Sequence, residues 1–206
     1  MKSLLRFLPI LPFFVSTEAT FAQAPKAKAK VLEKFDFIDP KTVKLTDIKA
    51  KVVSTQDPDH RKALEMIGDF HKAESYPRVE KMFPAGTLNA AKYSGIRFYA
   101  KTENGSKMNV HISGAQPKPD GRPFDLNVYL TLTDLWREYT IPFSDFKYYQ
   151  FKVWKDGAQK VYPGGEPLAE GDLAQIVRIS FVFYIGGRGT DTTARALIDG
   201  LELIEK

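Results

Sequence analysis

The stretch Gly95–Gly114 reads GIRFYAKTENGSKMNVHISG and contains two strand patterns in succession. In the first pattern, apolar and polar residues alternate, which places Ile96 and Phe98 on one face of a strand and Arg97 on the other. The second pattern, KMNVHISG, has the same period of two. Asn104-Gly105 lies between them and is typical of a β-hairpin turn. The stretch therefore predicts two half-buried strands joined as a hairpin.

Similar patterns recur along most of the chain, separated by turn residues such as Lys155-Asp156-Gly157. The further candidate strands are Val31–Phe37, Lys44–Ser54, Lys62–Gly68, Tyr76–Phe83, Leu126–Leu132, Trp136–Phe143, Ile176–Ile185 and Ala194–Ile204. In the last of these both parities carry apolar residues, so its buried face is not assigned. Only Leu168–Ile176 and residues 143–146 suggest short helical turns. Many short strands without long helices predict an all-β chain folded as one β-sandwich or barrel.

The N-terminal residues 1–22 have the layout of a secretory signal peptide. Lys2 and Arg6 precede an apolar run, Leu8–Val15, which small residues follow. This run is too short to span a membrane as a mature helix. We expect cleavage after Ala22, then a flexible, basic leader over residues 23–30 and the sandwich domain over residues 31–206. The expected location is secreted or periplasmic, with no membrane span after signal cleavage.

Composition and motifs exclude several classes of function. The 206 residues include no cysteine, which excludes disulfides, Cys-bearing zinc sites and thiol catalysis. The net charge of +5 arises from dispersed lysines rather than a focused stripe, so we expect no nucleic-acid partner. Three scattered histidines lack metal-ligand spacing, and neither a nucleophile elbow nor a phosphate-binding loop is present. We therefore expect that the protein is not an enzyme.

Three stretches in order carry a family resemblance. They are SGIRFYAKTENG (residues 94–105), DLWREYTIPFSDF (134–146) and LAEGDLAQIVRISFVF (168–183), the last followed by the terminal ALIDGLELIEK (196–206). Together they resemble the galactose-binding-like jelly-roll superfamily, above all carbohydrate-binding module family eleven and the complex-I-intermediate-associated thirty-kilodalton group. The resemblance implies a single jelly-roll β-sandwich. It does not fix the function, because this superfamily hosts many ligands.

The resemblance also implies that the first and last strands can share a structural calcium ion. Asp36 and Asp199 are then the candidate ligands. Calcium needs six or more oxygen ligands, and the Ile198-Asp199-Gly200 triplet lacks the second carboxylate of the commoner pattern. The alternative is that both are strand-end carboxylates satisfied by hydrogen bonds.

The segment Lys147–Tyr162, KYYQFKVWKDGAQKVY, is an aromatic ribbon interleaved with lysines. As a hairpin, it places Tyr148 and Trp154 on a mixed face, and Tyr149, Phe151 and Val153 on an apolar face. We expect the apolar face to be buried and Tyr148 and Trp154 to bind ligand. Pyranose rings stack their C–H faces on aromatic side chains, while their hydroxyls bond to amides and charged groups.

Further ligand contacts are expected from the strands, as the resemblance also suggests. In consecutive candidate strands, one set of alternate positions carries polar or aromatic side chains. These are Arg97, Tyr99, Asn109, His111, Asn127 and Tyr129. If those strands are neighbours, these residues line one groove. The leading hypothesis is a non-catalytic protein that recognises carbohydrate by stacking and hydrogen bonding. The alternative is a protein-interaction or assembly module that uses the hairpin 147–162 as its partner surface.

Overall fold

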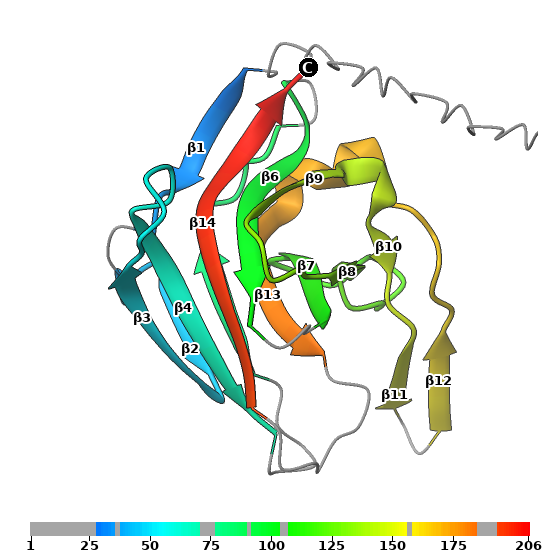
Figure 1. The fold of residues 1–206 in the computed structure, drawn as a ribbon. Coiled ribbons are helices and arrows are strands. Elements are labelled where there is room, and N and C mark those ends of the chain that lie inside the picture. The colour runs from blue at the N-terminus through cyan, green and yellow to red at the C-terminus, as the bar shows by residue number, and fades with distance from the viewer. Residues whose placement is uncertain are drawn as a thin grey trace, which may run out of the picture.

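The computed structural model describes residues 28–35, 38–70, 77–89, 92–103, 107–155, 158–184 and 193–206. Two six-stranded antiparallel sheets pack face to face, and a two-stranded sheet lies apart from them (Figure 1). The prediction of an all-β sandwich with short helical turns is confirmed. Within the described ranges, no helix is long and apolar enough to cross a membrane. The predicted signal peptide and most of the predicted leader lie outside the described residues.

The first sheet, sheet A, has the strand order β3-β4-β14-β6-β9, and β1 also pairs with β14. Its strands are β1 (Ala29–Glu33), β3 (Ile48–Ser54), β4 (Lys62–Asp69), β6 (Tyr93–Thr102), β9 (Arg137–Pro142) and β14 (Thr193–Glu205).

The second sheet, sheet B, has the order β10-β8-β7-β13-β5-β2. Its strands are β2 (Val43–Thr46), β5 (Arg78–Met82), β7 (Lys107–Gly114), β8 (Asp125–Thr131), β10 (Lys147–Tyr148) and β13 (Ile176–Tyr184). The separate pair is β11 (Phe151–Lys155) and β12 (Ala158–Tyr162), and the helical turns are η1 (Phe143–Asp145) and η2 (Glu170–Gln175).

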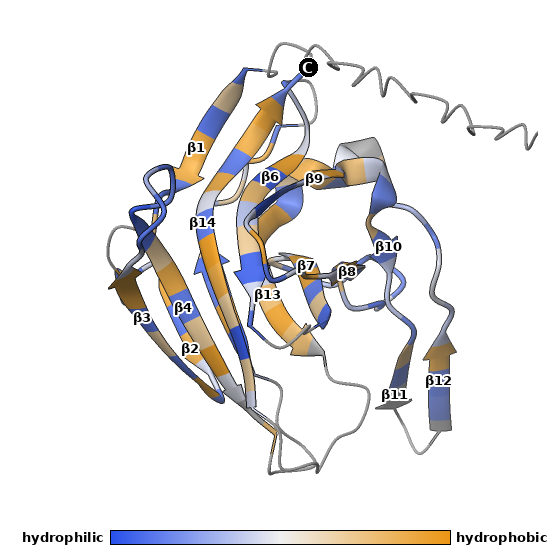
Figure 2. Ribbon diagram, in the orientation of Figure 1, coloured by the Kyte–Doolittle hydropathy of each residue, from blue (hydrophilic) through white to orange (hydrophobic). Residues whose placement is uncertain are grey.

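The core lies between the two sheets and explains the alternation in the sequence. Apolar side chains alternate with polar ones along the strands, as Figure 2 shows. The ring of Phe98 in sheet A lies edge-on to that of Phe181 in sheet B, with centroids 5.0 Å apart, and both are fully buried. Each sheet thus turns its apolar face inward and leaves one polar face outward.

The predicted hairpin at Asn104-Gly105 is wrong, because the two strands it joins lie in different sheets. β6 pairs with β14 and β9, whereas β7 pairs with β13 and β8. The chain therefore crosses from one layer to the other here, so that the apolar faces of β6 and β7 both turn to the core. The turn residues themselves lie outside the described residues. The second hairpin prediction is confirmed by the β11–β12 ladder from Phe151↔Tyr162 to Lys155↔Ala158.

A second crossover divides the predicted strand Lys44–Ser54. β2 belongs to sheet B and β3 to sheet A, and Asp47 between them adopts a φ of 51°. Aspartate tolerates this left-handed conformation better than most residues, so one residue suffices to redirect the chain.

A bulge in β14 explains why its sequence has apolar residues on both parities. The register with β6 shifts between Asp199 and Glu202, and Gly200 there has a φ of 58°. Ala196 and Ile198 face the core before the bulge, and Leu201 after it. The extra residue reverses the alternation, and glycine takes the left-handed conformation without strain.

Candidate functional site

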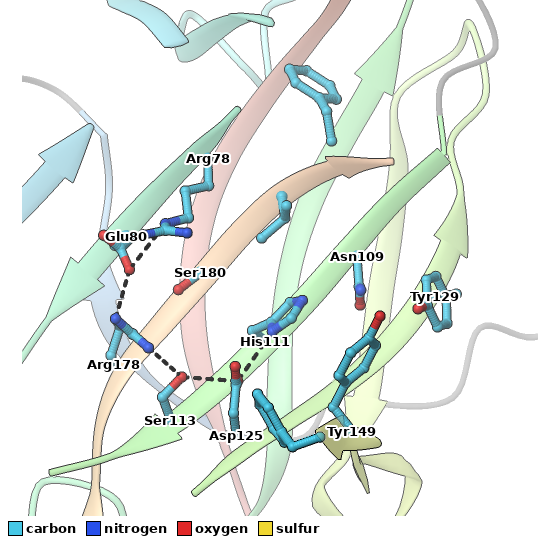
Figure 3. Close-up of a pocket in the computed structure, with 13 residues that line it drawn as sticks. Arg78, Glu80, Asn109, His111, Ser113, Asp125, Tyr129, Tyr149, Arg178 and Ser180 are labelled. Atoms are coloured by element: carbon cyan, nitrogen blue, oxygen red, sulfur yellow. Dashed lines mark hydrogen bonds and ion pairs between the residues drawn. The ribbon is translucent and has the colours of Figure 1, made fainter. Parts of the chain in front are cut away.

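The outward face of sheet B carries a pocket of about 220 Å³. It is lined from strands β5, β13, β7 and β8 and from the segment after β10 (Figure 3). Its lining residues are Arg78, Glu80, Asn109, His111, Ser113, Asp125, Tyr129, Tyr149, Phe151, Arg178, Ser180, Val182 and Phe183. Apart from Phe183, which belongs to the core, the lining residues on these strands alternate with core residues, so the pocket lies on the face away from the core.

A row of hydrogen bonds runs across the floor of the pocket (Figure 3). The Asp125 carboxylate lies 3.1 Å from Nδ1 of His111 and accepts a bond of 3.0 Å from the Ser113 hydroxyl. Arg178 donates through Nη2 to that hydroxyl at 2.9 Å. In the tautomer that donates Nδ1–H to Asp125, Nε2 of His111 is a hydrogen-bond acceptor. The row fixes several polar groups on a rigid sheet.

Glu80 continues this row beneath two arginines. Its side chain is only 1% exposed, and Oε1 lies 2.8 Å from Nη1 of Arg178. Nε of Arg78 lies 3.4 Å from the same oxygen. A buried carboxylate is stabilised only when cations or donors surround it, so Glu80 and Arg178 hold each other in position.

Two tyrosines supply flat surface at the opposite end of the pocket from Arg78 (Figure 3). Tyr129 of β8 is 53% exposed and Tyr149 is 43% exposed. The Tyr149 ring packs edge-on against Phe151 with centroids 5.6 Å apart. Exposed rings in a pocket are suited to stack against a flat apolar surface.

The prediction placed Tyr148 on the ligand-binding face of the aromatic ribbon and Tyr149 on the buried face, and the structure shows the reverse. Tyr148 was expected to bind ligand, but it is 5% exposed and packs beside Phe124, whereas Tyr149 lines the pocket. The reason is the pairing of β10 with β8, where Tyr148 lies opposite the core residue Leu126. The ladder then breaks before β11, so the ribbon is not one continuous hairpin. The side chain of Trp154 lies outside the described residues, and its ligand role stays a prediction.

Tyr148 is buried and packs in the core, so its side chain stabilises the fold and is not accessible to a ligand. Its hydroxyl donates a weak bond of 3.4 Å to Asp172, and the Arg122 guanidinium lies 5.1 Å from the ring centroid. Burial and the neighbouring charge of Asp172 raise the pKa of Tyr148 to about 12.

Four of the predicted strand residues share the pocket face. Asn109 and His111 of β7 and Tyr129 of β8 line the pocket. Asn127 lies opposite His111 in the β7–β8 ladder and is also buried. Oδ1 of Asn109 and Nδ2 of Asn127 are buried without a hydrogen-bond partner in the described part of the chain.

Arg97 and Tyr99 do not join this groove, which corrects the prediction that grouped them with it. They lie on β6 of sheet A, which is not a neighbour of β7 or β8. Arg97 donates through Nε to Glu202 at 2.8 Å, and the Tyr99 hydroxyl donates to Glu138 at 2.7 Å. Both side chains are therefore engaged in cross-strand contacts on the other outward face.

Ion pairs also cover the rest of that face of sheet A. The buried Glu65 accepts a bond of 2.7 Å from Nε of Arg195, and Lys51 lies 3.2 Å from its second oxygen. Burial alone would raise the pKa of Glu65, but the hydrogen bonds and charges of Arg195 and Lys51 outweigh it and lower the pKa.

The calcium prediction stays a prediction. Asp36 lies outside the described residues, and the Asp199 carboxylate lies 2.9 Å from Nδ1 of His60. No group of three or more acidic or histidine side chains within the described ranges is placed to hold a metal ion.

Sequence reasoning missed the half of the pocket that comes from β5 and β13. Arg178 and Ser180 alternate with core residues in IVRISFVF, and Arg78 and Glu80 do so in RVEK. This alternation was a usable signal. Without the strand order, however, no local pattern shows that these residues lie beside His111 and Asp125.

Comparison with known proteins supports the fold. No protein-family model matches the chain, and no curated protein matches it. Among solved structures, the family 11 carbohydrate-binding module of the cellulosomal cellulase Lic26A-Cel5E of Clostridium thermocellum is similar, with a TM-score of 0.59 and 18% identity. The alignment covers 88% of this chain and 97% of that one. The chain has a carbohydrate-binding-module fold.

Two further structures agree with this assignment. A family 11 module from Clostridium thermocellum in complex with a β-1,3-1,4-mixed-linked tetrasaccharide has a TM-score of 0.58 and 18% identity, over 87% of this chain and 97% of that one. An exo-β-agarase has a TM-score of 0.59 and 13% identity, over 85% of this chain and 25% of its own. The predicted resemblance to family eleven is confirmed at the level of fold.

Proposed function

We propose that the protein is a secreted, non-catalytic carbohydrate-binding protein that holds a saccharide in the pocket on sheet B. The observation that carries the proposal is the combination of two exposed tyrosine rings, Tyr129 and Tyr149, with a row of fixed polar groups on one rigid face. Stacked rings and convergent polar groups are what a sugar requires, because a pyranose has apolar faces and a polar rim.

The rings supply the apolar part of the binding energy. Tyr129 comes from β8 and Tyr149 from the connection after β10, so the two rings approach the pocket from different segments. Tyrosine loses little conformational entropy on binding and offers a large flat surface, which makes it a frequent energetic anchor.

The polar groups supply specificity. Oδ1 of Asn109 and Nδ2 of Asn127 are buried without partners in the described part of the chain, and such groups are costly in an empty site. Sugar hydroxyls both donate and accept, so in the pocket they can satisfy Oδ1 of Asn109 and Nε2 of His111. Because the row through Asp125 and Ser113 already fixes these strands, little reorganisation is needed.

The family 11 module solved with a mixed-linked tetrasaccharide supports the ligand class, because it shares this fold over nearly its whole length. Its ligand belongs to that protein. The saccharide of the present chain remains to be found by screening.

The test is native affinity electrophoresis against a panel of soluble polysaccharides, followed by calorimetry on the best ligand. We expect retardation of the wild type, and Tyr129→Ala and Tyr149→Ala to weaken binding at least about tenfold, the effect of losing an anchoring tyrosine. Tyr99→Ala, which removes a tyrosine from the opposite face, and Leu135→Ala, which removes an exposed apolar residue outside the pocket, serve as matched controls and should retain affinity.

Two results would contradict the proposal. The first is no retardation by any glycan in the panel. The second is equal loss of affinity in Tyr99→Ala and Tyr129→Ala, which would mean that the pocket face is not the binding face. Trp154→Ala belongs in the same series, because the predicted ligand role of Trp154 implies loss of affinity in that variant.

A further inference from the structure

Arg78 lines the pocket with unused hydrogen-bonding capacity. Its side chain is 34% exposed, and its only ion pair within the described residues is the 3.4 Å approach to Glu80. That approach is not a hydrogen bond, and Nε of Arg78 is buried without a hydrogen-bond partner among the described residues. A guanidinium has five N–H donors in a planar fork, and within the described residues only the 3.4 Å approach to Glu80 engages those of Arg78.

Arg178 lies on the other side of Glu80 and is fixed in place. It donates to Glu80 and to Ser113, while its Nε has no partner in the described ranges. Both arginines thus share a single carboxylate, which neutralises only one of their two charges. The excess positive charge sits at the end of the pocket away from Tyr129 (Figure 3).

The outward face of five neighbouring strands of the sheet has the same excess. Along β2, β5, β13, β7 and β8, the register places four cationic side chains on this face against two carboxylates. The cations are Lys44, Arg78, Lys107 and Arg178, and the carboxylates are Glu80 and Asp125. With His111 counted as neutral the net charge is +2. A face with an excess of positive charge attracts anions and repels cations.

We propose that the pocket selects an anionic saccharide, one whose sugars carry carboxylate or sulfate groups, and that Arg78 binds that group. The inference rests on the proposed carbohydrate function and deepens it. Planar N–H pairs match carboxylate and sulfate oxygens, and such charge-assisted bonds are roughly twice as strong as neutral ones. In this arrangement the tyrosines stack on one sugar while the arginine end of the pocket holds the charged substituent of the same saccharide.

The test compares ligands that differ only in charge. Calorimetry would measure oligogalacturonate against the same oligosaccharide with its carboxylates methyl-esterified, and a sulfated galactan oligosaccharide against its desulfated form. We expect at least one anionic form to bind about tenfold more tightly than its neutral partner, as charge-assisted bonds allow. The preference should also shrink as salt rises.

Variants separate the pocket from general charge attraction. Arg78→Gln should reduce the preference for the anion to about threefold or less, because the guanidinium that binds the charged group is lost. Arg78→Lys should retain part of it, since the charge remains without the planar fork. Lys49→Gln removes the same charge from the outward face of sheet A and should keep the full preference.

The outcomes are distinct from those of the proposed function. Equal binding of charged and neutral forms would overturn the anionic preference while leaving carbohydrate binding intact. Equal losses in Arg78→Gln and Lys49→Gln would show unspecific attraction to a basic protein and would also overturn it. Failure of every glycan, charged or neutral, would refute the proposed function together with this inference.

Discussion

Removal of Arg178 should destabilise the protein far more than removal of Arg78, although both contact the same carboxylate. Arg178 makes a 2.8 Å bond to the buried Glu80 and a 2.9 Å bond to Ser113. Losing a hydrogen bond to a buried charge costs about 1.5–3 kcal/mol, and because Arg178 is a third exposed we expect about 2 kcal/mol for Arg178→Gln. Arg78 approaches Glu80 only to 3.4 Å, so Arg78→Gln should cost about 0.5 kcal/mol.

Urea denaturation at neutral pH would measure both variants, with thermal unfolding as a second probe. For a chain of this size, 2 kcal/mol corresponds to a fall in Tm of about 4–8 °C, and 0.5 kcal/mol to about 1–2 °C. A double-mutant cycle with Glu80→Gln should give a coupling to Arg178 of about 1–2 kcal/mol and a much smaller coupling to Arg78.

Comparable losses in the two single variants would refute this reasoning, as would a coupling to Arg178 near zero. Either result would mean that Glu80 is not held chiefly by Arg178. The expected outcome has a practical use, because a stable Arg78→Gln variant allows the anion preference to be measured without a folding defect.

Four further predictions concern stability and ionisation. Phe181→Ala removes a fully buried ring that joins the two sheets and should cost about 3–5 kcal/mol in urea denaturation; a cost below about 1 kcal/mol would contradict the packing described. Gly114→Ala would place a Cβ 1.6 Å from Cδ1 of Phe124 and should cost about 1–3 kcal/mol, part of which Phe124→Leu should restore. The pKa of the Glu65 carboxyl is lower in the folded protein than its unfolded value near 4.5, so its ionised form stabilises the fold fully above that pH and loses this effect as pH falls through the folded pKa. Glu65→Gln should therefore destabilise the protein less at pH 3 than at pH 7. An equal loss of stability at both pH values would refute the assignment. In an ultraviolet phenolate titration, the tyrosine ionising at about pH 12 should disappear in Tyr148→Phe, and its persistence would assign that pKa to another residue.

The sequence predicts the positions of the strands, but it does not predict which strands pair with each other. Alternation located β6 and β7 correctly because a period of two depends only on neighbouring residues. Two successive half-apolar strands can either lie side by side in one sheet or face each other across a core, and both arrangements bury the same side chains. The strands β6 and β7 face each other across the core in different sheets, and so do β2 and β3 on either side of Asp47. Only contacts distant in sequence, such as Phe98 against Phe181, distinguish the two.

The candidate site was predictable to the same extent. Asn109, His111, Asn127 and Tyr129 lie on one face, as predicted, because β7 and β8 are both consecutive in sequence and paired. Tyr148 and Tyr149 were exchanged because a two-residue strand ends between them, and parity counting assumes an unbroken ladder. The arginine end of the pocket comes from β5 and β13, whose position beside β7 follows from sheet topology alone.

The two outward faces of the sandwich differ in a way that favours sheet B as the binding face. On sheet A, charged groups are matched across strands, as in Arg97 with Glu202 and Arg195 with Glu65, so a ligand there would have to displace existing ion pairs. On sheet B, buried polar atoms of Asn109 and Arg78 lack hydrogen-bond partners in the described part of the chain, whereas the buried Oε2 of Glu65 on sheet A, which also lacks one, has Lys51 at 3.2 Å. Such groups lower the stability of the empty protein, and a ligand that satisfies them recovers that free energy on binding. Sheet B combines such atoms with two exposed tyrosine rings in one pocket, and this combination favours it as the face for a saccharide.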